Sequence, residues 1–189
     1  MNQQISIIRH AFSDNGFGIK LINFFLFQSV WLITVLGAAR GITWPGIAMI
    51  GLFALIHGLI IPAPKRDFIL LALATVTGFI CDSALVRWEW LQVTTTFPIP
   101  GLAPLWMLIL WANLALAINH CLGWLHQRYW LAAVCGAIGG PLAYLGGVAL
   151  GAGTFDANPV GTIGLLSAVW FFVTPALFRL ATLLENRRD

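Results

Sequence analysis

Six apolar runs fill most of this chain, and each is long enough, at about twenty residues, to cross the hydrocarbon core of a bilayer as a helix. Only short connections separate the runs, which leaves no room for a separate soluble domain. The runs are Leu21–Ala38, Thr43–Ile61, Phe68–Val86, Pro104–Leu125, Tyr129–Gly151 and Val160–Leu180. We therefore predict an all-α membrane protein, a compact bundle of six transmembrane helices at residues 21–180. In this prediction residues 1–20 form a cytoplasmic or interfacial segment, and residues 181–189 form a short cytoplasmic tail.

The composition supports the same class. Hydrophobic residues make up 59% of the 189 residues, charged residues make up 9%, and the mean hydropathy is +0.87. Soluble domains carry about 25% charged residues. The composition therefore excludes an ordinary soluble domain.

The formal net charge of +3 indicates a membrane topology rather than a nucleic acid partner. If the spans alternate in direction, Arg40 and Arg87 fall on one side of the membrane and all the other basic residues fall on the opposite side. Those others are Arg9, Lys20, Lys65, Arg66, Arg128, Arg179, Arg187 and Arg188. Because the more basic side of a membrane protein stays in the cytoplasm, we predict that both termini are cytoplasmic.

Asp82 is the only carboxylate that falls inside a predicted span. An ionisable side chain at the bilayer centre costs at least about 2.5 kcal/mol, so it seldom persists without a partner or a role. Asp82 is therefore expected either to serve a ligand or a proton, or to anchor the bundle through backbone groups or through Arg87 one turn later. A single intramembrane carboxylate also excludes a two-carboxylate mechanism within the membrane.

The remaining polar side chains of the spans fall at two depths, because each helical residue advances the chain by 1.5 Å. The band in the middle and outer part of the membrane holds Gln28, Asp82, Asn113 and Tyr144. The band nearer the cytoplasm holds His57, Asn119 and His120. We expect the members of each band to face one another.

One face of the fourth span is the predicted wall of a cavity, since Trp106, Asn113 and His120 follow one another at intervals of two helical turns. The connection Trp88–Pro100 contains two tryptophans and is expected to lie over the mouth of the bundle as a lid. A small apolar or amphipathic molecule, or a lipid, would then bind in an outward-facing cavity, with Trp106 and Trp111 stacked on it. The predicted ligand-binding residues are Gln28, Asp82, Trp106, Trp111, Asn113, Asn119, His120 and Tyr144.

A membrane-embedded enzyme that modifies lipids is an alternative, with His120 or His57 as the general acid–base group. The sequence offers no carboxylate or thiolate partner near either histidine. Cys81, Cys121 and Cys135 lie inside spans without a CxxC pair, so they are expected to pack as small apolar residues. Too few ligands stand at helical spacing for a metal site, and we expect neither a metal nor a cofactor.

A second alternative is a scaffold subunit that binds other membrane proteins. Small residues recur on one face of the fifth span, where they allow close helix packing. This stripe consists of Gly136, Gly140, Ala143, Gly147 and Gly151. The stripe packs either within the bundle or against a partner.

Five stretches stand out together: NFFLFQSVW at 23–31, Cys81-Asp82-Ser83, LWMLILW at 105–111, INHCLGWL at 118–125 and GGPLAYLGG at 139–147. Together they resemble a domain-of-unknown-function family of short bacterial inner-membrane proteins. The resemblance implies a location in the bacterial inner membrane and genes beside lipid-modifying enzymes of the cyclopropane fatty-acid type, but no activity. The positions that carry it are Gln28, Asp82, Ser83, Trp106, Trp111, Asn119, His120, Pro141 and Tyr144.

Overall fold

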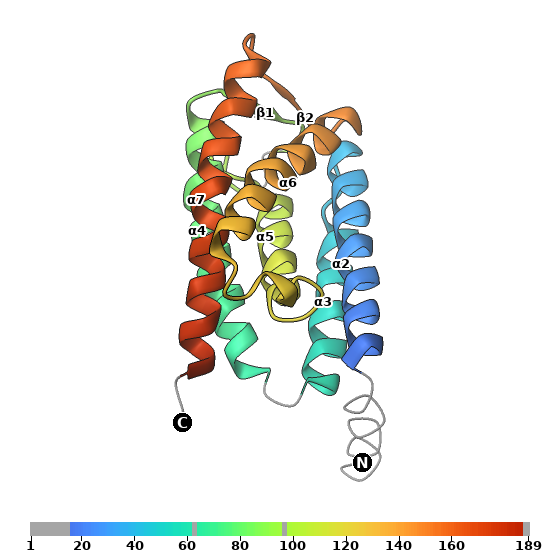
Figure 1. Cartoon of the computed structure of the whole chain (residues 1–189). Helices are drawn as coiled ribbons and strands as arrows, with labels where there is room; N and C mark the ends of the chain where they lie inside the picture. The colour runs from blue at the N-terminus through green and yellow to red at the C-terminus, as the bar shows by residue number, and fades with distance from the viewer. Residues whose placement is uncertain (1–15, 62–63, 96–97, 187–189) are drawn as a thin grey trace.

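The computed structural model describes residues 16–61, 64–95 and 98–186. Within them, six α-helices form a bundle (Figure 1). The helices are α2 (Gly16–Ala39), α3 (Trp44–Ile60), α4 (Lys65–Arg87), α5 (Leu105–Ile118), α6 (Tyr129–Ala149) and α7 (Pro159–Asn186). The described residues also form the strands β1 (Leu91–Val93) and β2 (Gly153–Phe155) and the 3-10 turn η1 (Gly123–Leu125).

Four of the helices, α2, α4, α6 and α7, are long and apolar enough to cross a membrane. The other two are apolar but shorter, with 17 residues in α3 and 14 in α5, which correspond to lengths of about 25 and 21 Å. Large apolar side chains such as Phe25, Ile80 and Phe172 are exposed on the outer faces of the long helices, where a soluble protein would seldom carry so many. These features indicate a membrane protein, although two of the six expected spans fall short of full spanning length.

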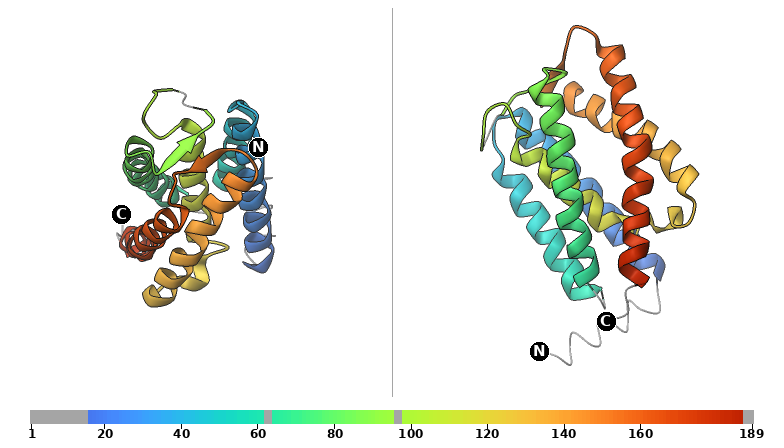
Figure 2. Two further views of the ribbon diagram at one scale, coloured as in Figure 1. Left: turned by 90° about the horizontal axis from the view of Figure 1, so that it is seen from above. Right: turned by 90° about the vertical axis from the view of Figure 1, so that its left-hand side faces the viewer.

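The helices alternate in direction, so α2 begins and α7 ends at the same end of the bundle, which we call the terminal end (Figure 1). The strands lie at the opposite end, which we call the β end. Viewed from above, α5 lies in the middle of the other helices (Figure 2), and ten of its residues are buried. It packs against α2, α3 and α4, whereas α6 packs mainly against α7.

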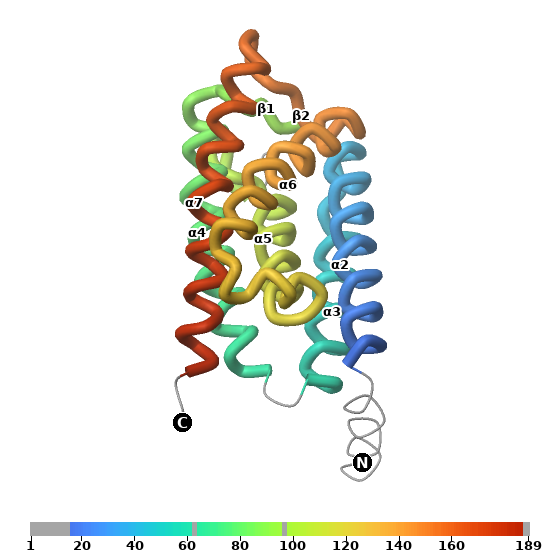
Figure 3. Tube along the Cα trace, in the orientation of Figure 1, coloured from blue at the N-terminus to red at the C-terminus, as the bar shows by residue number. Residues whose placement is uncertain are grey.

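The central helix α5 ends at Ile118 instead of continuing to Leu125, because a side chain of α2 holds its end. Asn23 donates a hydrogen bond from Nδ2 to the carbonyl oxygen of Leu116 (2.9 Å), and its Oδ1 accepts one from the backbone N–H of Cys121 (3.3 Å). The chain then turns back inside the length of the bundle, as the tube in Figure 3 shows. Such irregular backbone is tolerated at membrane depth where protein groups satisfy it.

The early end of α5 corrects one prediction. His120 follows the helix and lies in the turn before η1. It therefore does not share a helical face with Trp106 and Asn113.

The two connections at the β end pair with each other. β1 and β2 are antiparallel, with Leu91 opposite Phe155 and Val93 opposite Gly153. The chain can turn from α6 into β2 because Gly151 has a φ of +91°, the left-handed conformation that commonly ends a helix. Among the described residues of the Trp88–Pro100 connection, β1 therefore lies over the β end of the bundle, as the sequence predicts.

The small residues of α6 pack within the chain. A Cβ added to Gly140 would lie 2.2 Å from Cγ of Trp170, and one added to Gly136 would lie 2.1 Å from Oγ1 of Thr174. Both contacts are to α7, so this part of the stripe is covered and is not free to bind another protein.

Candidate functional site

A cavity of about 480 Å³ lies between α2 and α5 on one side and α6 and α7 on the other. Ligand pockets typically measure about 300–1,000 Å³. Along α5 the wall runs from Trp106 to Ile118, a distance of about 18 Å, so the cavity is elongated. Leu91 and Val93 of β1 and Gly153 of β2 also line it. Most of its wall is apolar.

Most of the predicted ligand-binding residues meet at this cavity. Those that line it are Gln28, Asp82, Trp106, Trp111, Asn113 and Tyr144. Asn119 and His120 are not among its lining residues. The band of Gln28, Asp82, Asn113 and Tyr144 therefore surrounds one space, while the band nearer the terminal end lies elsewhere.

Asp82 is held in the cavity wall by two neutral donors. Trp111 donates from Nε1 to Oδ2 of Asp82 (2.8 Å), and the hydroxyl of Tyr144 donates to Oδ1. Asp82 is 1% exposed, whereas Arg87 is exposed. The anchor that the structure shows for Asp82 is therefore formed by the side chains of Trp111 and Tyr144, rather than by the expected backbone groups or Arg87.

Glycines make room for the tryptophans beside Asp82. Trp111 stacks on Trp170, with ring centroids 4.7 Å apart and planes inclined by 12°. A Cβ added to Gly78 would lie 2.1 Å from Cγ of Trp111, and Gly140 leaves similar space for Trp170. The glycines of α4 and α6 thus allow a flat aromatic wall on one side of the cavity.

Three buried polar atoms of the cavity wall have no hydrogen-bond partner among the residues that the structure describes: Trp106 Nε1, Asn113 Oδ1 and Thr174 Oγ1. The amide nitrogen of Asn113 does have a partner, the carbonyl oxygen of Phe27 (3.0 Å). A buried polar group without a partner costs about 1–3 kcal/mol. The wall therefore contains both a donor and an acceptor that remain to be satisfied.

A second buried carboxylate, Asp67, corrects the expectation that Asp82 is the only one. Helix α4 begins at Lys65 rather than at the expected Phe68, so Asp67 lies in its first turn, and it is 4% exposed. An acidic residue just before an apolar run is itself a signal for the start of a helix. That signal identifies Asp67 in the sequence.

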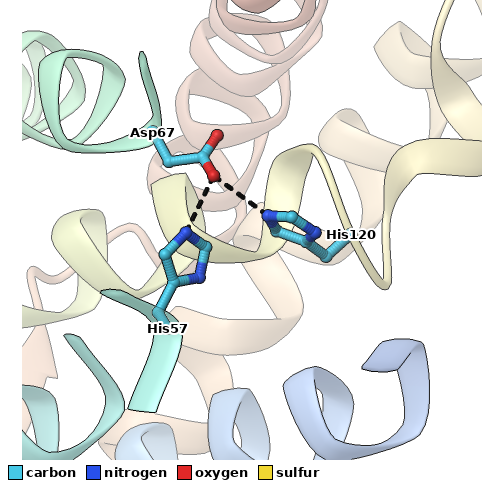
Figure 4. Close-up of side chains that lie close together, drawn as sticks. All are labelled: His57, Asp67 and His120. Atoms are coloured by element: carbon cyan, nitrogen blue, oxygen red, sulfur yellow. Dashed lines mark hydrogen bonds and ion pairs between the residues drawn. The ribbon is translucent and has the colours of Figure 1, made fainter. Parts of the chain in front are cut away.

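Asp67 brings the second polar band together (Figure 4). Oδ2 of Asp67 lies 2.8 Å from Nε2 of His57 and 3.0 Å from Nε2 of His120. The other oxygen, Oδ1, accepts a hydrogen bond from Nδ2 of Asn119 (2.5 Å). The two imidazole rings lie 4.8 Å apart between centroids. Side chains from α3, α4 and the turn after α5 therefore meet at one carboxylate.

The cluster extends to α7 through His126 and Thr182, two residues that are not among the predicted site residues. Oδ1 of Asn119 lies 2.9 Å from Nε2 of His126, and Nδ1 of His126 lies 3.3 Å from Oγ1 of Thr182. The hydroxyl of Thr182 donates to the carbonyl oxygen of Phe178 (3.0 Å). The sequence offered no pattern for this chain of contacts, since His126 follows the predicted span and Thr182 lies in the predicted tail.

Three chemical conclusions follow from these positions. Asp67 and Asp82 are 15 residues apart on α4, which corresponds to about 22 Å, so they do not form a two-carboxylate site. His120 has a carboxylate partner, Asp67, which corrects the expectation that no carboxylate lies near it. No metal site was expected, because Asp67 was not counted among the possible ligands. In the structure, His57, Asp67 and His120 converge as three potential ligands.

Comparison with curated proteins and with solved structures finds no match. A model of one family matches residues 20–176, a range that includes both carboxylate clusters except for Thr182. This match agrees with the family resemblance noted in the sequence. The chain belongs to the family described as proteins of unknown function, DUF2878.

Proposed function

We propose that this membrane protein binds an amphipathic molecule with one long apolar chain, such as a fatty acid or the acyl chain of a lipid. The observation that carries the proposal is the elongated apolar cavity of about 480 Å³. Ligand sites combine mostly apolar walls with a few placed polar groups. A cavity that follows α5 for about 18 Å suits an extended chain better than a compact molecule.

The polar groups of the wall suggest how the head of such a molecule is bound. Trp106 supplies an unpartnered N–H, and Asn113 supplies an unpartnered oxygen. Both side chains are buried, at 6% and 1% exposed. The two residues are two turns apart on α5, about 10 Å along the helix, so the carboxyl or hydroxyl group of the ligand would bind at one of them.

Packing favours entry from the bilayer. α6 packs closely on α7 but makes few contacts with α2. Gln28 of α2 and Leu142 of α6 both line the cavity and are both exposed on the outer surface of the bundle. Since β1 and β2 cover the β end, the interval between α2 and α6 is the route that an apolar molecule would take.

A substitution that fills the cavity tests the proposal. Gly147 lines the cavity, and no atom outside its own helix lies within 4 Å of a Cβ built there, so Gly147→Leu adds a side chain to open space. Gly164→Leu is the matched control, because Gly164 of α7 is equally uncrowded but exposed and outside the cavity wall. The probe is 9,10-dibromostearic acid, whose bromines quench nearby tryptophans such as Trp106.

We expect saturable quenching in the wild type and in Gly164→Leu, and loss of its saturable part in Gly147→Leu. Native mass spectrometry of protein purified in mild detergent should detect a retained lipid or fatty acid on the wild type and on Gly164→Leu, but not on Gly147→Leu. Equal quenching in the wild type and Gly147→Leu, or a wild type that neither retains a molecule nor shows saturation, would overturn the proposal.

We further propose that the protein lies in the bacterial inner membrane with both termini in the cytoplasm. Two observations support this orientation: α2 begins and α7 ends at the same end of the bundle (Figure 1), and the basic residues concentrate on one side. A phosphatase reporter fused after Asp189 should be inactive and a cytoplasmic fluorescent reporter should be active. The reverse result would invert the orientation.

The enzyme alternative gains one supporting contact, the 3.0 Å distance between His120 and Asp67. Neither His120 nor His57 lines the cavity, however. Binding is therefore the better supported function. Lipid analysis of a deletion strain that carries either the wild type or His120→Ala separates binding from catalysis. If His120 is catalytic, the lipid profiles of the two strains must differ.

A further inference from the structure

The cluster around Asp67 has the donor atoms of a metal site. One ring nitrogen of His57, one ring nitrogen of His120 and one carboxylate oxygen of Asp67 all lie within 4.8 Å of one another. Imidazole nitrogen and carboxylate oxygen are the usual ligands of Zn²⁺ and of non-haem Fe²⁺. The three residues come from separate elements (Figure 4), so the fold, and not a local repeat, brings them together.

The geometry is near that of a bound ion. Both imidazole nitrogens approach the same oxygen, Oδ2 of Asp67, at 2.8 and 3.0 Å. Two ligands of a tetrahedral zinc ion, each about 2.0–2.1 Å from the metal, lie roughly 3.4 Å apart. Small side-chain shifts therefore suffice to seat an ion between the three atoms.

Neighbouring groups orient the carboxylate as the outer partners of a metal site do. Asn119 binds Oδ1 of Asp67, which leaves Oδ2 for an ion. Asn119 is in turn fixed by His126. Partners of this kind typically change metal affinity by about 10–100-fold when they are mutated.

Charge also favours a cation at this position. Among the described residues, the ion-pair partners of Asp67 are His57 and His120, which carry charge only when protonated. Protonation of both imidazoles would place two like charges beside each other. A divalent ion compensates the buried carboxylate while both histidines remain neutral.

We propose that His57, Asp67 and His120 bind one divalent transition-metal ion of the zinc and ferrous-iron class. The side chain of His120 is 14% exposed, so one side of the site can be reached from outside. Three protein ligands leave at least one coordination position open, as in catalytic rather than structural zinc sites. The site is separate from the lining of the apolar cavity, and the inference does not depend on the proposed lipid binding.

Cobalt titration of the full chain tests this site. The protein is purified through a tag without histidines, stripped with a chelator and titrated with Co²⁺, whose visible absorption reports its ligands. We expect one Co²⁺ per chain, displacement by Zn²⁺ and two imidazole ligands by X-ray absorption. Asp67→Asn and His120→Gln should each weaken Co²⁺ binding by at least about tenfold. Mutation of a group that only orients a metal ligand already weakens binding by about that factor.

Asp82→Asn is the matched control, because it makes the same chemical change on the same helix away from the cluster. It should bind Co²⁺ as the wild type does. Absence of a saturable cobalt spectrum in the wild type, or a spectrum without imidazole ligands, would overturn the site, even if Asp67→Asn and His120→Gln do not fold. Wild-type affinity in folded Asp67→Asn and His120→Gln would overturn it as well.

Discussion

Asp67 and Asp82 are both buried on α4, at 4% and 1% exposed, yet their surroundings differ. Asp82 accepts hydrogen bonds from Trp111 and Tyr144, two neutral donors on aromatic rings. Asp67 is surrounded by two histidines and an asparagine. One carboxylate is part of an apolar wall, and the other is the centre of a polar cluster.

The difference shows that burial alone does not define the role of an intramembrane carboxylate. The donors around Asp82 are held by stacking and by close helix packing, so this cluster depends on shape. The groups around Asp67 depend on its charge, because His57, His120 and Asn119 each make a polar contact to that one carboxylate. Substitutions that change charge or shape separately can therefore distinguish the two clusters.

The largest effect is expected from Asp67→Ala. It leaves His57, His120 and Asn119 without their common partner in a poorly solvated site, and breaking a buried pair of this kind costs about 3–5 kcal/mol. Because one side of the cluster is partly exposed, we expect a loss of about 3 kcal/mol in the free energy of unfolding. SDS-induced unfolding of chelator-treated protein in mixed micelles measures it without a contribution from metal. A loss below about 1 kcal/mol would show that the histidines do not depend on Asp67.

A change of shape next to the Asp82 cluster should have the second largest effect. In Gly140→Ala the new Cβ would lie 2.2 Å from Cγ of Trp170, so the indole must move and its stacking on Trp111 is lost. Overpacking of this kind costs about 1–3 kcal/mol, and we expect about 2 kcal/mol together with a weaker near-ultraviolet circular dichroism signal. Gly139→Ala is one residue earlier, and no atom of another described element lies within 4 Å of a Cβ built there, so it should cause no loss. Equal losses in both variants would indicate a general intolerance of α6 to substitution.

The fold could be predicted from the sequence to the extent that it depends on apolar runs. The existence of all six helices is confirmed, as is the close packing of Gly136 and Gly140. The length of α5 could not be predicted, because a residue far away in the sequence, Asn23, ends that helix. Apolar periodicity carries no information about such a contact.

The candidate site could be predicted only in part. Depth counting brought Asp82, Asn113 and Tyr144 together because they lie inside regular helices, where sequence position converts to distance. Depth counting does not include Asp67, because the apolar run that predicts its helix begins just after it, at Phe68. His126 could not be found, since it reaches its cluster through an irregular turn whose path is set by tertiary contacts.

A change of charge at the Asp82 cluster should have a smaller effect than at Asp67. In Asp82→Asn the amide oxygen can still accept from Trp111, and the hydroxyl of Tyr144 can rotate to accept from the amide nitrogen. Two hydrogen bonds to a carboxylate become two ordinary ones, so we expect a loss of about 1 kcal/mol in the same unfolding assay. A loss as large as that of Asp67→Ala would remove the distinction between a cluster that depends on shape and one that depends on charge.

The smallest effect is expected from Thr182→Val, which tests how far the Asp67 cluster extends. The substitution keeps the shape of the side chain and removes a hydroxyl that lies 3.3 Å from Nδ1 of His126 and donates to the carbonyl oxygen of Phe178. Because the contact to His126 is long and the site is only partly buried, we expect a loss of about 0.5 kcal/mol. In a double-mutant cycle with Asp67→Ala, additivity within about 0.5 kcal/mol would limit the cluster to the residues nearer Asp67. A larger coupling energy would show that α7 is part of the charged network, and the contrast with the compact Asp82 cluster would then be one of extent as well as of charge.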